Sequence, residues 1–270
     1  YWKDVPTSIH HCLHETAGLF ADYKRKNPNL KIMNYIQLGG WDNSVRVVNK
    51  AEIALNINVQ IAYNGDGFIF FPGITPNDFI NDPNMDKKYQ NGLMGFVDAS
   101  GHKTQYVEMV RPLIDQANAI SKITLNKEFL GVYYTGKFIS GFDKNIDLDN
   151  VVDSDCIYQG EELDFVKYNG DKLDLTTTGQ LIVSVYKDKD KLCYLLTNNS
   201  IVSDIDVTIC LPRDMVLIKD SKKTSHSKNV QVNIPAGENV VLGAGDEYTF
   251  TVEARDKYDN PIKTDFKDNF

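Results

Sequence analysis

The chain of 270 residues carries 29 Lys and Arg against 37 Asp and Glu, a formal net charge of −8. Charged residues make up 24% and hydrophobic residues 42% of it, which is typical of a folded globular protein rather than a disordered one. The acidic balance argues against nucleic acid as a partner, because neutralising phosphates requires a basic face. The sequence contains no run of 18 or more apolar residues, so we predict no membrane span.

The first half of the sequence alternates between helical and extended patterns. Apolar residues recur at helical spacing over residues 9–23, and the Asn-Pro-Asn run at 27–29 then ends the predicted helix. Residues 31–37 are typical of a short buried strand. Asn49 is followed three residues later by Glu52, a spacing that predicts a capping box and the start of a second helix.

Residues 68–71 are predicted to form a second strand, and residues 103–123 a third helix with one apolar stripe. Pro112 lies within this helix and should kink it or mark its true start. Strands that alternate with helices require a parallel arrangement with helical crossovers. Because two parallel strands cannot bury both of their faces alone, we expect residues 1–140 to pack against the second half or another chain.

The second half shows strand-like runs separated by turn-rich links and no comparable helix. The predicted strands span residues 130–134, 163–168, 181–186, 192–197, 205–211, 215–218, 230–234, 240–242 and 248–252. Strands at this spacing without intervening helices indicate an antiparallel β-sandwich. We therefore divide the chain into a first domain over residues 1–140, a sandwich over 141–254, and a polar tail or linker over 255–270.

Three stretches of the first half carry a family resemblance. They are residues 31–41 (KIMNYIQLGGW), 49–52 (NKAE) and 62–71 (AYNGDGFIFF). Together they resemble the last two βα units of bacterial (β/α)8-barrel glycoside hydrolases, the barrel β-galactosidases and related glycosidases of gut bacteria. The resemblance implies a fold class of α/β plus all-β: the last βα units of such a barrel, followed by an antiparallel β-sandwich. A complete barrel needs about 250 residues, so the missing N-terminal barrel portion or another copy of the chain is an expected partner.

The same resemblance leaves the catalytic residues unknown. Glycoside hydrolysis normally needs two carboxylates that flank the scissile bond. In the barrel β-galactosidases the nucleophile is a glutamate at the end of the seventh strand, and the matching position here is about Ile36. The acid/base would come from a fourth strand that this sequence lacks. We therefore expect this chain alone to hydrolyse no glycoside.

Substrate-binding residues are expected where the barrel strands end. In this fold, function lies at the C-terminal ends of strands and in the loops that follow, which singles out Gln37, Trp41, Asp42 and Phe71. Trp41 could stack on a sugar ring while Gln37 and Asp42 hydrogen-bond to hydroxyls. The alternative is that Trp41 packs the loop against the barrel and that Asp42 only turns the chain.

No cofactor and no metal are predicted. His10 and His14 would share a helical face, but the order of the zincin motif and a third ligand are missing, so we interpret them as ordinary helix residues. The four cysteines contain no C-x-x-C pair. Cys193 and Cys210 fall in neighbouring predicted strands and could face each other, but buried free thiols are the favoured interpretation. Asn198 opens a glycosylation motif of a kind that often arises by chance.

The leading functional hypothesis is carbohydrate processing by a fragment of a glycoside hydrolase, with activity left open. The alternative is a non-catalytic carbohydrate-binding or accessory surface module, and the missing glutamate near Ile36 favours it. Residues 252–262 resemble the opening strand of bacterial immunoglobulin-like surface modules. This second resemblance implies a secreted or cell-surface bacterial protein.

Overall fold

A computed structural model of the chain describes residues 16–40, 47–74, 95–98, 100–135, 174–189 and 191–244. Its helices are α2 (Thr16–Lys26), α3 (Lys50–Ala62) and α6 (Tyr106–Thr124). Its strands are β1 (Met33–Gln37), β2 (Gly67–Phe71), β3 (Glu128–Thr135), β4 (Asp174–Thr177), β5 (Leu181–Asp188), β6 (Lys191–Asn198), β7 (Ile205–Cys210), β8 (Met215–Lys219), β9 (Lys222–His226), β10 (Val230–Ile234) and β11 (Asn239–Ala244). None of the helices in these ranges is long and apolar enough to cross a membrane.

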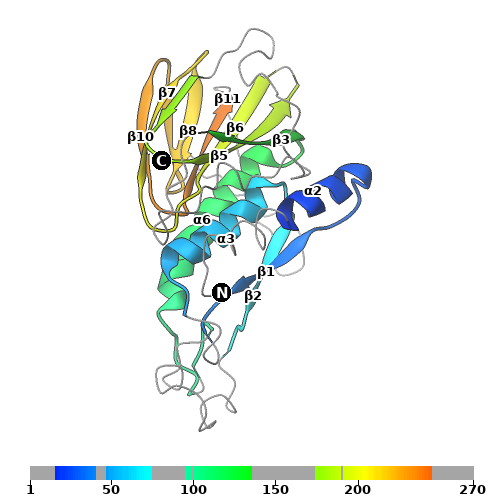
Figure 1. Cartoon of the computed structure of the whole chain (residues 1–270), viewed down its shortest axis with the longest axis vertical. Coiled ribbons are helices and arrows are strands. Elements are labelled where there is room, and N and C mark those ends of the chain that lie inside the picture. The colour runs from blue at the N-terminus through cyan, green and yellow to red at the C-terminus, as the bar shows by residue number, and fades with distance from the viewer. Residues whose placement is uncertain are drawn as a thin grey trace, which may run out of the picture.

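The described elements stack in four layers (Figure 1). A three-stranded sheet in the order β10-β7-β4 packs on a six-stranded sheet in the order β3-β5-β6-β11-β8-β9. The helices cover the other face of the six-stranded sheet, and the pair β1-β2 lies beyond the helices. Three hydrophobic clusters fill the three spaces between these layers.

The fold class expected from the sequence is wrong. Of the eleven strands in the described residues, nine belong to the two antiparallel sheets, and β1 and β2 pair in parallel as a separate two-stranded sheet. The described part of the chain is therefore mainly antiparallel β-structure with a layer of helices, not a remnant of a (β/α)8 barrel. The physical difference lies in α3. Helices of a barrel form its outer ring, whereas α3 is buried between two sheets.

Helix α3 forms where the capping signal predicted it. The backbone N–H of Glu52 donates to Oδ1 of Asn49 at 2.9 Å, and the N–H of Asn49 donates to Oε2 of Glu52 at 2.8 Å. The capping box is thus confirmed, and Glu52, which could have been taken for a catalytic carboxylate, serves the helix start. At the other end the chain leaves the helix through Asn64, whose φ is +62°.

Helix α6 buries the predicted stripe. Its residues at helical spacing, Tyr106, Val110, Leu113, Ala117 and Ile120, are all buried. Pro112 lies inside the helix on its exposed side and does not mark the start, which is at Tyr106. The stripe therefore reaches both the cluster beneath β1-β2 and the cluster beneath the six-stranded sheet.

The first half of the chain packs against the second half, as expected from its two parallel strands. Leu55 and Val59 of α3 share one buried cluster with Ile182, Leu195 and Val241 of the six-stranded sheet. Strand β3 comes before the predicted boundary at residue 140, yet it pairs with β5 in this sheet. The boundary itself falls outside the described residues and stays a prediction.

The strands of the second half lie close to their predicted positions where the structure describes them. The predicted runs at 163–168 and 248–252 fall outside the described residues. Two observed strands, β4 and β9, were not predicted, and each lies at the edge of its sheet. Strand β9 follows β8 through Asp220 and Ser221, which both have positive φ, as a two-residue hairpin turn of type I′ requires.

The described cysteines, Cys193 and Cys210, form no disulfide; Cys193 is buried, as favoured from the sequence, whereas Cys210 is partly exposed. Cys193 lies in β6 of the six-stranded sheet and Cys210 in β7 of the three-stranded sheet, so the two do not neighbour each other in one sheet. The glycosylation motif has a structural role, because Asn198 is fully buried and its Nδ2 donates to the carbonyls of Ser203 and Ile234.

Candidate functional site

Two of the four predicted site residues lie side by side at the ends of β1 and β2. Gln37 and Phe71 are the last pair in the parallel register of these strands. The Gln37 side chain donates from Nε2 to the Gly39 carbonyl at 2.5 Å. The other two predicted residues, Trp41 and Asp42, lie outside the described residues. The structure therefore brings together only Gln37 and Phe71.

A tight backbone arrangement holds these strand ends. The Leu38 N–H donates to the Phe71 carbonyl at 2.7 Å, and the Gly95 N–H donates to the Leu38 carbonyl at 2.9 Å. Gly95 has a φ of +71°, and a Cβ there would meet backbone atoms of Pro72 and Gly73 at 2.8 Å. Only glycine therefore fits where this third segment meets the ends of the two strands.

The outward side of β1-β2 is apolar and exposed. Because side chains alternate along a strand, Ile36, Phe68 and Phe70 turn toward the helices, and the residues between them turn outward. Those outward residues are Met33 (55% exposed), Tyr35 (68%), Ile69 (42%) and Phe71 (51%), which we call the aromatic face. The rings of Tyr35 and Phe71 meet edge to face, with centroids 6.3 Å apart.

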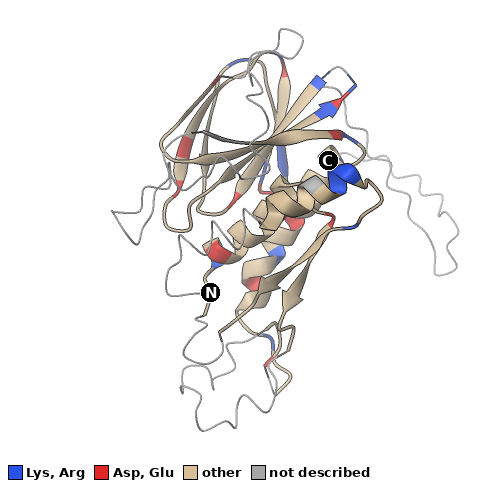
Figure 2. Ribbon diagram, turned by 45° about the vertical axis from the view of Figure 1, so that its right-hand side comes forward, with Lys and Arg blue, Asp and Glu red and all other residues tan. Residues whose placement is uncertain are grey.

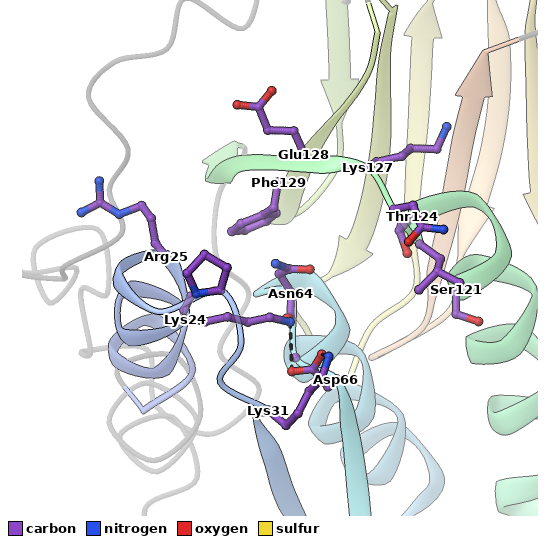
Figure 3. A pocket seen from close by; sticks show the side chains of 15 residues that line it. Lys24, Arg25, Lys31, Asn64, Asp66, Ser121, Thr124, Lys127, Glu128 and Phe129 are labelled. Carbon is purple, nitrogen blue, oxygen red and sulfur yellow. Dashed lines mark hydrogen bonds and ion pairs between the residues drawn. The ribbon is translucent and has the colours of Figure 1, made fainter.

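A cavity lies near the opposite ends of the same strands. It has a volume of about 510 Å³, and it is lined mainly by α2, α6, the turns that follow α3 and α6, and the start of β3 (Figure 3). The last turn of α2 next to it is basic, as Figure 2 shows in blue. We call it the basic cavity. Its lining residues are Ala21, Lys24, Arg25, Pro28, Lys31, Asn64, Gly65, Asp66, Ser121, Thr124, Leu125, Asn126, Lys127, Glu128 and Phe129.

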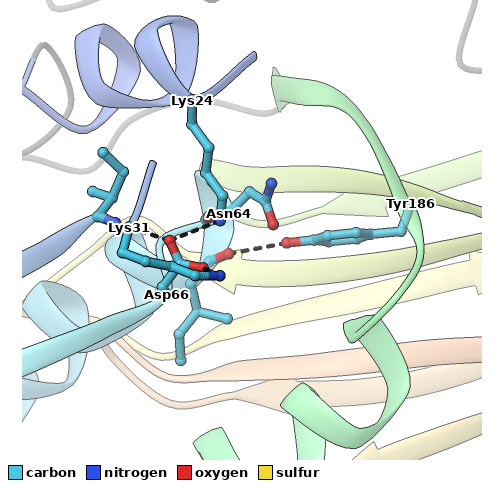
Figure 4. A network of polar contacts seen from close by, with 7 residues as sticks. Lys24, Lys31, Asn64, Asp66 and Tyr186 are labelled. Atoms are coloured by element: carbon cyan, nitrogen blue, oxygen red, sulfur yellow. Dashed lines mark hydrogen bonds and ion pairs between the residues drawn. The ribbon is translucent and has the colours of Figure 1, made fainter. Parts of the chain in front are cut away.

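Asp66 is the centre of a polar network at this cavity (Figure 4). Its carboxylate accepts the Ile32 N–H at 2.8 Å and forms ion pairs with Lys24 at 3.0 Å and Lys31 at 3.3 Å. Lys24 also donates to the Asn64 carbonyl at 2.7 Å. Burial opposes ionisation of Asp66, but the Ile32 hydrogen bond and the two ammonium groups outweigh it and lower the pKa of the carboxyl. Asp66 is therefore an anion at neutral pH.

Sequence reasoning missed this network. Asp66 lies between two glycines just before β2, a local pattern that by itself indicates only a turn. Its partners Lys24 and Lys31 lie 42 and 35 residues away in the sequence, and no local spacing links them. A second hollow of about 340 Å³ shares Asn64 and Asp66 with the basic cavity. At its edge the Tyr186 hydroxyl donates to the Ile61 carbonyl at 3.1 Å, and burial raises the pKa of this phenol.

The described residues hold no group of three or more His, Cys, Asp or Glu side chains that could bind a metal. Ile36, which stands where the resemblance would place a nucleophilic glutamate, is buried and apolar. Comparisons with protein-family models, curated proteins and solved structures find no match for this chain.

Proposed function

We propose that this chain binds carbohydrate without catalysis, through the aromatic face of β1-β2. The observation that carries the proposal is the exposed pair of Tyr35 and Phe71, with Gln37 directly beside Phe71 in the strand register. Five-residue strands place these side chains on a rigid sheet instead of a loop, and a rigid platform loses little conformational entropy when a ligand binds.

The chemistry of the face suits a neutral sugar. A pyranose ring presents C–H groups on its faces and hydroxyls around its edge. Aromatic rings offer apolar contact to the C–H groups. A carboxamide such as that of Gln37 can both donate hydrogen bonds to the hydroxyls and accept them. Met33 and Ile69 extend the apolar area, and none of the residues of the face is charged. Recognition would therefore depend little on salt concentration.

Hydrolysis receives less support than binding. A retaining or inverting glycosidase needs two carboxylates across the scissile bond. The position matched to the nucleophile is Ile36, which is buried and apolar, and the nearby carboxylate of Glu52 is engaged in capping α3. The expected extracellular or cell-surface location remains a prediction that fits a glycan-binding protein.

Glycan-array screening followed by calorimetric titration tests the proposal. We expect binding of neutral oligosaccharides, weakened about tenfold or more in Tyr35→Ala and Phe71→Ala, because each removes ring contact worth about 1–2 kcal/mol. Tyr23→Ala is the matched control, since Tyr23 is an aromatic residue of α2 that is 52% exposed and lies outside the aromatic face. Binding that is indifferent to both face variants, or turnover of nitrophenyl glycosides by the wild-type chain, would contradict the proposal.

A further inference from the structure

The basic cavity combines an aromatic wall with two carboxamides. Phe129 points toward Asn64 and Lys24, and its ring packs on Tyr186 with centroids 5.3 Å apart (Figure 3). Asn64 follows α3 and Asn126 follows α6, each with a φ of +62°, so both carboxamides are held at corresponding positions after helix ends. Within the described residues neither carboxamide has a hydrogen-bond partner. Each can both donate and accept a hydrogen bond.

The charge of the cavity is opposite in sign to that of the chain. Four cationic and two anionic side chains line it, a net charge of +2, whereas the whole chain carries −8. Lys127 forms an ion pair with Asp188, and Glu128 forms one with Lys187. Near the two carboxamides, Lys24 and Lys31 therefore share the single carboxylate of Asp66. One positive charge remains uncompensated in this group.

We propose that the basic cavity is a binding site for a sugar acid, a pyranose that carries one carboxylate. The ring lies against Phe129, hydroxyls bond to the carboxamides of Asn64 and Asn126, and the carboxylate pairs with Lys31 and Lys24. The volume of about 510 Å³ lies within the range of small-molecule sites. This site is separate from the aromatic face and does not depend on the function proposed for that face.

The same geometry argues against inorganic phosphate as the ligand. Phosphate sites commonly use helix N-termini, whose N–H groups point at the anion. Here the helices α2, α3 and α6 direct their C-terminal turns to the cavity, as shown by its lining residues Lys24, Asn64 and Thr124. The partial negative charge of helix C-termini disfavours a compact dianion. A singly charged ligand with many hydroxyls fits this field better.

NMR titration of the full chain with glucuronic acid, glucose and inorganic phosphate tests this inference. We expect glucuronate to shift backbone amides around Asn64, Asn126 and Phe129 and to bind about tenfold more tightly than glucose. Lys31→Gln should weaken glucuronate binding about three- to fivefold, a modest effect because Lys31 is largely exposed. Asn126→Gly should weaken binding of the acid while glycine accepts the positive φ.

The controls separate this site from general charge effects and from the aromatic face. Lys222→Gln removes an exposed lysine from β9, at the far edge of the six-stranded sheet, and should leave glucuronate binding unchanged. Tyr35→Ala should also leave it unchanged, even if it abolishes binding of neutral oligosaccharides. Equal affinity for glucose and glucuronate, tighter binding of phosphate than of glucuronate, or no amide shifts around the cavity would each overturn the inference.

Discussion

At the scale of single residues, Asp66 shows how one carboxylate fixes several segments. It joins the last turn of α2, the start of β1 and the start of β2 through Lys24, Lys31 and the Ile32 N–H. Its pKa in the folded chain lies below the ordinary value of 3.8. A carboxyl whose pKa is lower in the folded chain than in the unfolded chain stabilises the fold at pH values above its unfolded-state pKa. This stabilisation is lost as the pH falls through the folded-state pKa.

Asp66→Asn should therefore lower the free energy of unfolding by about 1–2 kcal/mol at pH 7, because the amide cannot pair with the two ammonium groups. The difference between wild type and variant should shrink as the pH falls below about 4, where the carboxyl becomes protonated. Denaturant unfolding at a series of pH values measures it. Asp115→Asn, at an exposed position of α6, is the control. A pH-independent difference would show that the charge of Asp66 is not what matters.

Gly237 illustrates a second residue-scale constraint, a close approach between layers. Its φ is +71°, and a Cβ there would lie 2.2 Å from the Ala51 carbonyl oxygen and 2.8 Å from the Leu55 nitrogen. We expect Gly237→Ala to destabilise the chain by more than about 2 kcal/mol, since backbone strain and overlap with α3 add together. Thermal unfolding measures the loss.

Gly101→Ala separates the two causes. Gly101 also has a positive φ, +83°, but a Cβ there meets no atom within 4 Å. Gly101→Ala should therefore lower the free energy of unfolding only through backbone strain, by about 1 kcal/mol. Equal losses in the two variants would mean that overlap with α3 contributes nothing.

At the scale of elements, sequence patterns predicted the features that depend on residues close together in the chain. The capping box of Asn49 and Glu52 and the apolar stripe of α6 are local signals, and both were found as predicted. Strands β4 and β9 were missed because edge strands need no apolar alternation, and β9 reads KKTSH. The burial of α3 on both sides could not be predicted, because it depends on sheet strands more than a hundred residues away.

Asn49→Ala tests the start of α3. The substitution removes one half of the capping box and should cost about 1 kcal/mol of unfolding free energy, because the Glu52 N–H loses its acceptor. Asn49→Ser should restore most of the loss, since serine is a comparable cap. Asn118→Ala, at an exposed position within α6, should be neutral or slightly stabilising because alanine favours helix. A loss in Asn118→Ala as large as in Asn49→Ala would speak against a specific capping role.

The two candidate sites also differ in how far the sequence could predict them, because one depends on local signals and the other on contacts between distant segments. Gln37 and Phe71 could be placed at strand ends from sequence, and they do form a pair in the register. The basic cavity could not, because Lys24, Asn64 and Asn126 come from the ends of three different helices. Only the packing of those helices brings their ends together.

At the scale of the whole molecule, the layers share their cores. Leu55, Val59 and Ile120 of the helices lie in one cluster with Ile182 and Leu195 of the six-stranded sheet. Hydrogen bonds between side-chain amides add to this contact between the helices and the sheet. Asn239 donates to Asn58 Oδ1 at 2.7 Å, and Asn58 donates to the Gly237 carbonyl at 2.7 Å. The helical layer and the sandwich therefore stabilise each other.

This sharing predicts that the described layers unfold together. Helical circular dichroism reports on the helices, and near-ultraviolet tyrosine signals include Tyr186 and Tyr194 of the six-stranded sheet. The two signals should change at the same denaturant concentration, because separating the layers would expose side chains that each contribute about 1.5–3 kcal/mol when buried. Two well-separated transitions would show that the interface between the helices and the six-stranded sheet is weak and that the halves are independent domains.

The central claim is that the aromatic face binds carbohydrate, and the most direct measurement is an NMR titration of the chain with selectively labelled tyrosine and phenylalanine rings. A neutral oligosaccharide chosen from the array screen should shift the ring resonances of Tyr35 and Phe71, saturate, and leave those of Tyr106 and Tyr186 unchanged, since both are buried in the core. Binding that saturates without moving the Tyr35 and Phe71 rings would contradict the account.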